Sequence, residues 1–320
     1  MTTRLLMRRS LVWALTALAG HVAQADLILE MPPYSFSEKT AATMDAARQG
    51  LTTGYHGVAR YLDSFFKRED APPDIPKSTA RVRLSLRLKD ADGLSPSAAF
   101  YAKLALPHAE ERLNLFVDNL KRGTLPGDED PTLESQFNAG VRVWLWRQLR
   151  TYINLESGVR LHGIPDPFAQ LEYQHQQPWA GWVGRFTQQG FWYALEGVGE
   201  LTQIDIEHTF RGHKLFRMTT AAQWTEETSG MEFEQTFLYD WPLPGAHQRL
   251  IPSVSFFAHK NGPFLMDNYR ANVTWRRGLY RPWLILEVTP QIEFPRERDY
   301  QFTPSLRVGF ETWFGSLPED

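Results

Sequence analysis

The segment RVRLSLRLK, residues 81–89, has two faces of opposite character. Because successive side chains of an extended chain point to opposite sides, this alternation predicts a β-strand with one apolar and one basic face. The apolar parity comprises Val82, Leu84, Leu86 and Leu88, and the polar parity comprises Arg81, Arg83, Ser85, Arg87 and Lys89.

Similar segments follow one another to the end of the chain, separated by turn-forming motifs such as DADG, PLPG and KNG. We expect 12 to 14 strands. The segments are 80–89, 98–106, 111–118, 135–146, 149–161, 167–176, 180–195, 201–210, 213–225, 230–241, 247–259, 264–277, 281–294 and 301–314.

This many long antiparallel strands predicts an all-β protein, a transmembrane up-and-down β-barrel over residues 79–314. A single open sheet of this size would curl or split, whereas a closed barrel has no free edges. Most segments reach the roughly 9 to 11 residues that a tilted strand needs to cross a bilayer. In that setting the apolar parity faces lipid and the polar parity faces the lumen. A soluble periplasmic β-rich binding protein, with the apolar parity buried, stays open as an alternative.

The N-terminal 78 residues differ from the rest. Residues 1–25 combine Arg-rich, apolar and small-residue sections, which predicts a secretory signal peptide cleaved near Ala25. Residues 26–78 carry helical patterning and end in a Pro-rich linker, and glycines at 50, 54 and 57 predict a break into two helices. We expect this periplasmic segment to cap or plug the barrel, and residues 315–320 to form a C-terminal tail.

Composition limits the possible partners and chemistry. Without residues 1–25 the chain has 31 basic and 37 acidic residues, a formal charge of −6, which argues against nucleic acid. The sequence has 0 Cys, and its 9 His form neither HxH nor HExxH, so we expect no cofactor and no metal. Ser255 and His259 share a strand but lie too far apart for a catalytic pair, and we assign no catalytic residue. A lipid-acting hydrolase stays open as a second alternative.

Tryptophan is distributed unevenly along the predicted strands. If the chain enters from the periplasm, most tryptophans fall at the lower strand ends, as in the aromatic girdle of a membrane barrel. The predicted girdle comprises Trp144, Trp146, Trp179, Trp182, Trp241, Trp275, Trp283 and Trp313.

The polar parity supplies the predicted lumen. Two interpretations stay open: a selective path for anionic solutes, or a structural network of paired charges plugged by the N-terminal helices. The lumen-lining candidates are Arg81, Arg83, Arg87, Lys89, Arg150, Glu156, Arg160, Asp205, Glu207, Arg307 and Glu311.

The last strand, QFTPSLRVGFETWF, is similar to the terminal signal of bacterial outer-membrane proteins, although GSLPED follows its final Phe314. Together with ARYLDSFF, the stretch LEVTPQIEFPRERDYQFTPSLRVGFETWFG resembles uncharacterised proteobacterial outer-membrane β-barrel proteins. The resemblance implies a barrel in the outer membrane of a Gram-negative cell and brings no activity or site residues. In that location the expected partners are outer-membrane lipid, lipopolysaccharide and, through the C-terminal strand, the barrel-assembly machinery.

Overall fold

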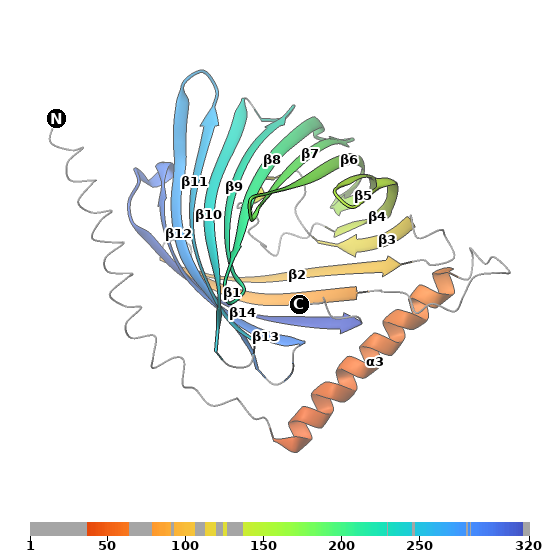
Figure 1. Ribbon diagram of the computed structural model, residues 1–320. Coiled ribbons are helices and arrows are strands. Elements are labelled where there is room, and N and C mark those ends of the chain that lie inside the picture. Colours follow the sequence, from red (N-terminus) through yellow and green to blue (C-terminus); the bar gives the residue numbers. More distant parts are fainter. Residues whose placement is uncertain are drawn as a thin grey trace.

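The residues that the structure describes form a closed antiparallel β-barrel of 14 strands and an N-terminal helix, α3 (Figure 1). The computed structural model describes residues 37–63, 79–90, 93–105, 113–119, 124–126, 137–228, 230–244, 247–279, 281 and 283–315. The predicted signal peptide, the Pro-rich linker and the C-terminal tail after Gly315 lie outside these residues. Within them, no helix is long and apolar enough to cross a membrane.

The predicted barrel is confirmed, and the strand number is 14. Each strand pairs with its neighbours in sequence, and β1 pairs with β14 to close the ring. The strands are β1 (Thr79–Lys89), β2 (Gly93–Ala105), β3 (Leu113–Asp118), β4 (Phe137–Arg147), β5 (Thr151–His162), β6 (Ile164–Trp179), β7 (Trp182–Tyr193), β8 (Gly197–Phe210), β9 (Lys214–Thr225), β10 (Met231–Leu243), β11 (Gln248–Lys260), β12 (Phe264–Gly278), β13 (Leu284–Pro295) and β14 (Thr303–Gly315).

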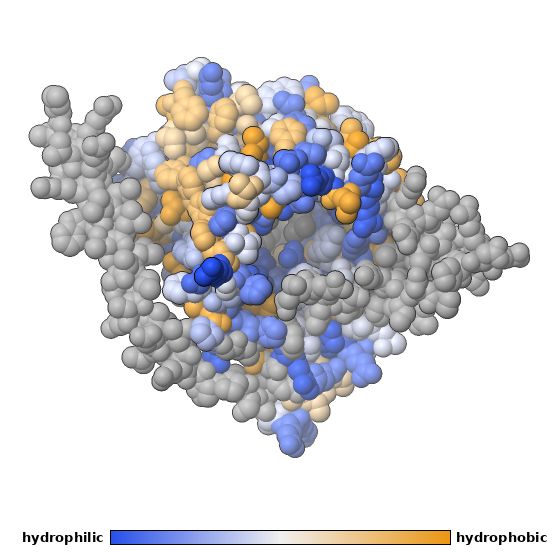
Figure 2. Space-filling view, in the orientation of Figure 1, coloured by the Kyte–Doolittle hydropathy of each residue, from blue (hydrophilic) through white to orange (hydrophobic). Residues whose placement is uncertain are grey.

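The two faces of the wall have the polarity of a membrane barrel. On β1, Leu84, Leu86 and Leu88 are 56%, 43% and 56% exposed, whereas Glu311 of β14, on the opposite parity, is 1% exposed. Exposed apolar residues continue around the barrel on the outward parity, for example Leu171 of β6, Ile204 of β8 and Phe310 of β14. Figure 2 shows hydrophobic residues on the outside and a hollow lined by hydrophilic ones. The apolar side of RVRLSLRLK therefore faces outward.

The two rims of the barrel differ. We call the end where β1 begins and β14 ends the terminal rim, and the opposite end the distal rim. Most turns are short at both rims: Ala180 and Gly181, both with positive φ, join β6 to β7 at the terminal rim, and Gly163 alone joins β5 to β6 at the distal rim. The longest connection, residues 119–136 between β3 and β4, is at the distal rim.

An apolar cluster occupies the inner face toward the distal rim. Phe116, Phe168 and Tyr193 lie on strands β3, β6 and β7, and their side chains are almost fully buried. Leu125, from the connection between β3 and β4, joins this cluster, so part of that connection packs inside the barrel. The cluster fills part of the bore that polar side chains leave open.

Two inward glycines let the wall pass close beneath these rings. Gly140 and Gly158 are paired across β4 and β5. A Cβ at Gly140 would lie 2.7 Å from the ring of Phe116, and one at Gly158 would overlap the Ala139 carbonyl oxygen and lie 2.8 Å from Gly140 Cα. Both positions therefore require glycine.

Gly158→Ala is expected to lower the free energy of unfolding by about 1–3 kcal/mol, because backbone atoms on β4 would have to shift. Urea unfolding monitored by tryptophan fluorescence would measure the change. Gly190→Ala is the matched control, since its added methyl meets no atom within 4 Å. Equal stability of the two variants would contradict the packing argument.

The helix is one continuous element, α3 (Glu38–Asp63), and the predicted break into two helices is wrong. Gly50, Gly54 and Gly57 lie inside it without ending it. Each glycine costs a helix only about 1 kcal/mol relative to alanine, and contacts with the barrel offset part of that cost.

The helix lies beside the terminal rim and outside the outline of the barrel in Figure 1. Arg48 Nε donates a hydrogen bond to the carbonyl oxygen of Trp313 at 3.1 Å, and its guanidinium lies 5.4 Å from the ring centroid of Trp283. Asp45 forms an ion pair with Arg281 at 3.1 Å. These contacts fix the helix to the ends of β13 and β14.

Arg48→Ala is expected to lower the free energy that holds α3 on the rim by about 1–2 kcal/mol, because one hydrogen bond and one cation–π contact are lost. Hydrogen exchange of the α3 amides should become faster while the strand amides keep their protection. Lys39→Ala, on an exposed position of the same helix, is the control. Unchanged exchange in Arg48→Ala would show that other contacts hold the helix.

Candidate functional site: the charged inner face of the barrel

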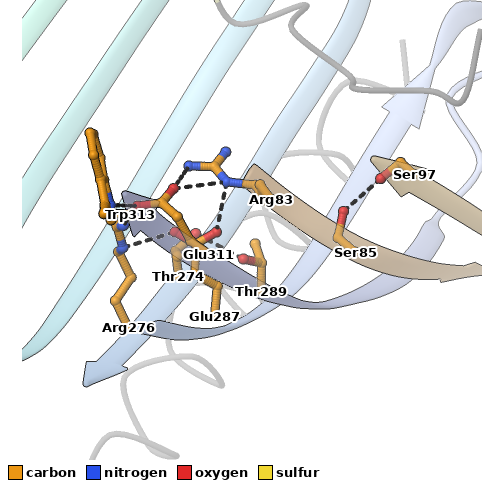
Figure 3. Close-up of polar contacts among 9 residues, drawn as sticks. All are labelled: Arg83, Ser85, Ser97, Thr274, Arg276, Glu287, Thr289, Glu311 and Trp313. Atoms are coloured by element: carbon orange, nitrogen blue, oxygen red, sulfur yellow. Dashed lines mark hydrogen bonds and ion pairs between the residues drawn. The ribbon is translucent and has the colours of Figure 1, made fainter. Parts of the chain in front are cut away.

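The inner face on both sides of the closure carries a network of charged side chains (Figure 3). Arg83 of β1 lies directly opposite Glu311 of β14 in the strand register. Arg83 Nη2 donates to Glu311 Oε2 at 2.6 Å, and Arg276 Nη2 donates to Glu311 Oε1 at 2.8 Å. Glu287 of β13 also forms ion pairs with both arginines, at 3.4 Å from Arg83 Nε and 2.8 Å from Arg276 Nε. The first and last strands are thus joined by paired charges as well as by backbone hydrogen bonds.

A second set of paired charges lies nearer the distal rim on the same side of the barrel. Glu293 of β13 accepts from Arg270 Nε at 2.8 Å and lies 3.4 Å from Lys89 Nζ. Its side chain is 5% exposed, so both cations are held at a buried carboxylate. Buried carboxylates need such partners because desolvation of an unpaired charge is costly.

Further pairs follow around the barrel from β4 to β9. Glu156 is opposite Arg142 and accepts from its Nε at 2.5 Å. Arg160 contacts the buried Asp166, and its guanidinium lies 4.2 Å from the ring centroid of Tyr193. These charges fix neighbouring strands to each other.

Strands β7, β8 and β9 carry one more connected group of charges, near the terminal rim. Glu207 receives Arg185 Nη1 at 3.1 Å and Arg217 Nε at 2.8 Å. Asp205, 2% exposed, accepts a hydrogen bond from Thr219 Oγ1 at 2.6 Å. All four charged groups come from the inner parity of adjacent strands β7, β8 and β9.

Most of the predicted lumen residues fall on this inner parity, and one does not. Arg81 lies over the ring of Trp313, with its guanidinium 5.4 Å from the ring centroid. Arg87 and Arg307 lie directly opposite each other across the closure. Arg150, in contrast, lies exposed in the turn between β4 and β5, because β5 begins only at Thr151.

The charges are distributed unevenly between two sides of the bore. The inner face from β12 through β14 to β2, which we call the seam wall, carries more basic than acidic side chains among the described residues. The inner face from β4 to β10, the opposite wall, carries more acidic than basic ones. The seam wall has Arg81, Arg83, Arg87, Lys89, Lys103, Arg270, Arg276 and Arg307 against Glu287, Glu293 and Glu311; the opposite wall has Arg142, Arg160, Arg185 and Arg217 against Glu156, Asp166, Glu172, Asp205, Glu207, Glu232, Glu234 and Asp240.

Several partners were missed in the sequence. Glu287 was not identified because the alternation of apolar and polar residues fails in its predicted segment, 281–294. That segment includes Trp283, which shares the parity of Glu287, whereas β13 begins only at Leu284. Asp166 was not identified because it lies between two prolines, a pattern that predicts a turn, whereas β6 already begins at Ile164. Arg142 and Arg185 lie on clear strands, and inward parity alone could have identified them.

The predicted girdle tryptophans all lie near the terminal rim, but their side chains do not share one face. Trp146, Trp179 and Trp241 are exposed on the outer face, and the outward parity includes Trp182 and Trp275. Trp313 turns inward, and its Nε1 donates to Glu311 at 2.8 Å. Trp144 also turns inward, opposite the buried Asn154, and Trp283 is 7% exposed beside α3.

The residues considered for other chemistry have separate partners. His259 Nδ1 lies 2.7 Å from the carboxylate of Asp267, and Ser255 Oγ accepts a hydrogen bond from Thr236 Oγ1 at 2.7 Å. Among the described residues, no group of three or more His, Cys, Asp or Glu side chains is arranged to hold a metal ion.

Comparison with known proteins yields distant similarities to barrel structures. No protein-family model and no curated protein matches the chain. OprB of Pseudomonas putida is 8% identical with a TM-score of 0.49, covering 75% of this chain and 94% of that one. OmpT of Vibrio cholerae, an outer membrane protein, is 8% identical with a TM-score of 0.46, covering 77% and 100%. A bacterial polysaccharide outer membrane secretin is 11% identical with a TM-score of 0.46, covering 75% and 98%. At these identities the similarities identify no family for the chain.

Proposed function

We propose that this chain is an outer-membrane β-barrel that passes small polar solutes through its charged bore. The observation that supports this most directly is the reversal of polarity across the wall. Apolar side chains such as Leu84 and Phe310 are exposed outside, while carboxylates such as Glu311 and Asp205 are buried inside. A continuous apolar outer surface of this extent is stable in lipid and a liability in water.

The same polarity argues against the soluble periplasmic alternative. A soluble barrel would expose its polar parity, whereas here the exposed parity holds the leucines of β1. The position of α3 at the terminal rim suits the periplasmic side, and the position of the longest strand connection at the distal rim suits the cell exterior. Secretion through residues 1–25, contact with lipopolysaccharide, and delivery to the assembly machinery through β14 belong to this proposal.

A structural role in the envelope is a second candidate, supported by the packing inside the bore. Phe168, Tyr193 and Leu125 occupy the distal half, and most inner carboxylates are fixed in ion pairs. In that case the barrel is sealed and carries no solute.

Conductance decides between the two candidates. The chain without residues 1–25 would be folded into planar lipid bilayers, and single-channel currents would be recorded in potassium chloride. Discrete current steps support passage. A protein that migrates as a heat-modifiable folded barrel yet never conducts would overturn passage and leave the structural role.

A further inference from the structure

Four polar side chains interrupt the apolar outer face of the barrel on strands β7 to β10. Gln188 of β7 is paired in register with Thr202 of β8, and Thr220 of β9 is paired with Gln235 of β10. All four lie on the outward parity, which they share with the exposed Ile204. We call these four residues the outer polar patch. The patch lies across the ring from the closure of β1 with β14 and from α3 (Figure 1).

The patch lies at the depth of the hydrocarbon region of a bilayer. On β7, Gln188 lies between the outward residues Trp182 and Trp192. At the usual strand tilt, these two tryptophans are separated by about 25 Å along the membrane normal, which matches the apolar band between the two aromatic girdles of a membrane barrel. On β9, Thr220 likewise lies between outward aromatic residues. The patch is therefore far from the interfacial water at either girdle.

The outward parity of the other described strands is apolar or aromatic at this depth, with one exception. Ser157 of β5 donates its hydroxyl to the carbonyl oxygen of Phe168 at 3.3 Å, so its donor is used within the wall. Thr151 and His175 also face outward, but they lie closer to the terminal rim and bond each other at 2.8 Å. Among the described strands, only β7 and β10 place a glutamine toward lipid at this depth.

Hydrogen bonds within the wall satisfy only part of the patch. Thr202 Oγ1 donates to Gln188 Oε1 at 2.6 Å, and Thr220 Oγ1 donates to Gln235 Oε1 at 2.7 Å. Gln235 Nε2 donates to the carbonyl oxygen of Thr219 at 3.0 Å, whereas Gln188 Nε2 donates to no described residue. Lipid tails offer no acceptor, and an amide without a partner in hydrocarbon is costly. The patch therefore favours a neighbour that presents polar groups at the same depth.

Small residues beside the patch give this part of the wall low relief. Gly190 of β7 is exposed, and a Cβ there would meet no atom within 4 Å. Ala222 of β9 lies directly opposite Thr202. Larger side chains frame this area toward the distal rim, where Trp192 and Trp224 are 45% and 38% exposed. Small residues at an interface within a membrane let two backbones approach closely, and polar side chains add hydrogen bonds between them.

We propose that the outer polar patch is the interface at which two copies of this chain pair side by side in the membrane. Copies inserted in the same orientation present their patches at the same depth, so amides and hydroxyls of one copy meet those of the other. A carboxamide is both donor and acceptor, which makes the patch complementary to itself, as a two-fold dimer requires. The proposal rests on the membrane location in the proposed function and is independent of the passage of solutes.

Self-association is measured on the folded chain without residues 1–25 by sedimentation equilibrium in a density-matched detergent. Q188L/Q235L replaces both amides by apolar side chains that suit lipid, so the barrel should still fold. Its dimer dissociation constant should rise at least about tenfold, because hydrogen bonds between the copies are lost. The control Q148L/Q301L makes the same two changes at exposed positions outside the strands and should associate as the unaltered protein does.

Proximity of the patches is tested in phospholipid vesicles with single cysteines, because the sequence has 0 Cys. A222C places a thiol beside the patch, and A271C places one on the outward parity in the middle of β12 as the matched control. A short bismaleimide at a low protein-to-lipid ratio should join A222C into dimers and leave A271C monomeric. Equal yields for the two variants would indicate random collision and overturn the proposal.

Failure of the interface and failure of the proposed function give different results. A barrel that folds into vesicles but stays monomeric leaves lipid as the occupant of the patch, which overturns the interface and not the membrane barrel. Association that persists in Q188L/Q235L also overturns the interface, because another surface is then responsible. Dimers that are lost in Q188L/Q235L, from a barrel that does not conduct, support the interface and overturn passage. A chain that forms no heat-modifiable barrel in lipid overturns both.

Discussion

Glu311→Gln is expected to lower the free energy of unfolding by about 3 kcal/mol. The Glu311 carboxylate is 1% exposed and receives Arg83, Arg276 and the indole of Trp313. A neutral amide of the same shape keeps the packing but leaves two partly buried guanidinium groups short of a countercharge, which is where most of the cost arises. The midpoint of urea unfolding and the temperature at which the folded form is lost on gels should both fall.

Glu227→Gln is the control for this prediction, because Glu227 lies exposed in the turn after β9. Its effect should stay within about 0.5 kcal/mol. The double variant E311Q/R83Q should recover part of the loss, since it removes one of the uncompensated cations. No difference between Glu311→Gln and Glu227→Gln would show that the closure is held by its backbone pairing alone.

Leu86→Arg is expected to destabilise the barrel in lipid by about 2–4 kcal/mol. Leu86 is 43% exposed near the middle of β1, opposite Val308, so an arginine there would have to enter the hydrocarbon region of a bilayer. Folding from urea into phospholipid vesicles would measure the effect through the shift of the unfolding midpoint. This prediction separates a membrane barrel from a soluble one, because in water the same change would improve solubility.

The same substitution at Leu149 is the control. Leu149 is 103% exposed in the turn between β4 and β5, outside both strands, so Leu149→Arg should fold into vesicles as the unaltered protein does. Equal folding yields and stabilities for Leu86→Arg and Leu149→Arg would contradict the placement of the outer face in lipid.

The strands were predictable from the sequence because the parity pattern is local. Segments such as 80–89 and 213–225 fall within one residue of β1 and β9. Parity also placed Arg83 and Glu311 on one kind of face. Closure of the barrel predicts that the first and last strands pair, but it does not set Arg83 opposite Glu311, because the register between β1 and β14 is not written in either strand alone.

The errors arose where an element boundary determined the result. Arg150 was assigned to a strand that begins one residue later, and α3 continues through glycines that were expected to end it. Both depend on contacts with distant parts of the chain. The pair of Arg87 and Arg307 was present in the sequence as two separate positions, and only the ring closure shows that they are neighbours.

The pairing of β1 with β14, which closes the barrel, has a consequence for how the protein folds. Every other strand pair joins neighbours in sequence, so hairpins can form one after another at little entropic cost. Joining the first strand to the last requires nearly the whole polypeptide to be in place, which makes this the slow, high-contact-order step. A chain truncated before β14 would retain its hairpins but leave one edge of β1 and one edge of β13 permanently unpaired, and association with other chains would be its route to pairing those edges.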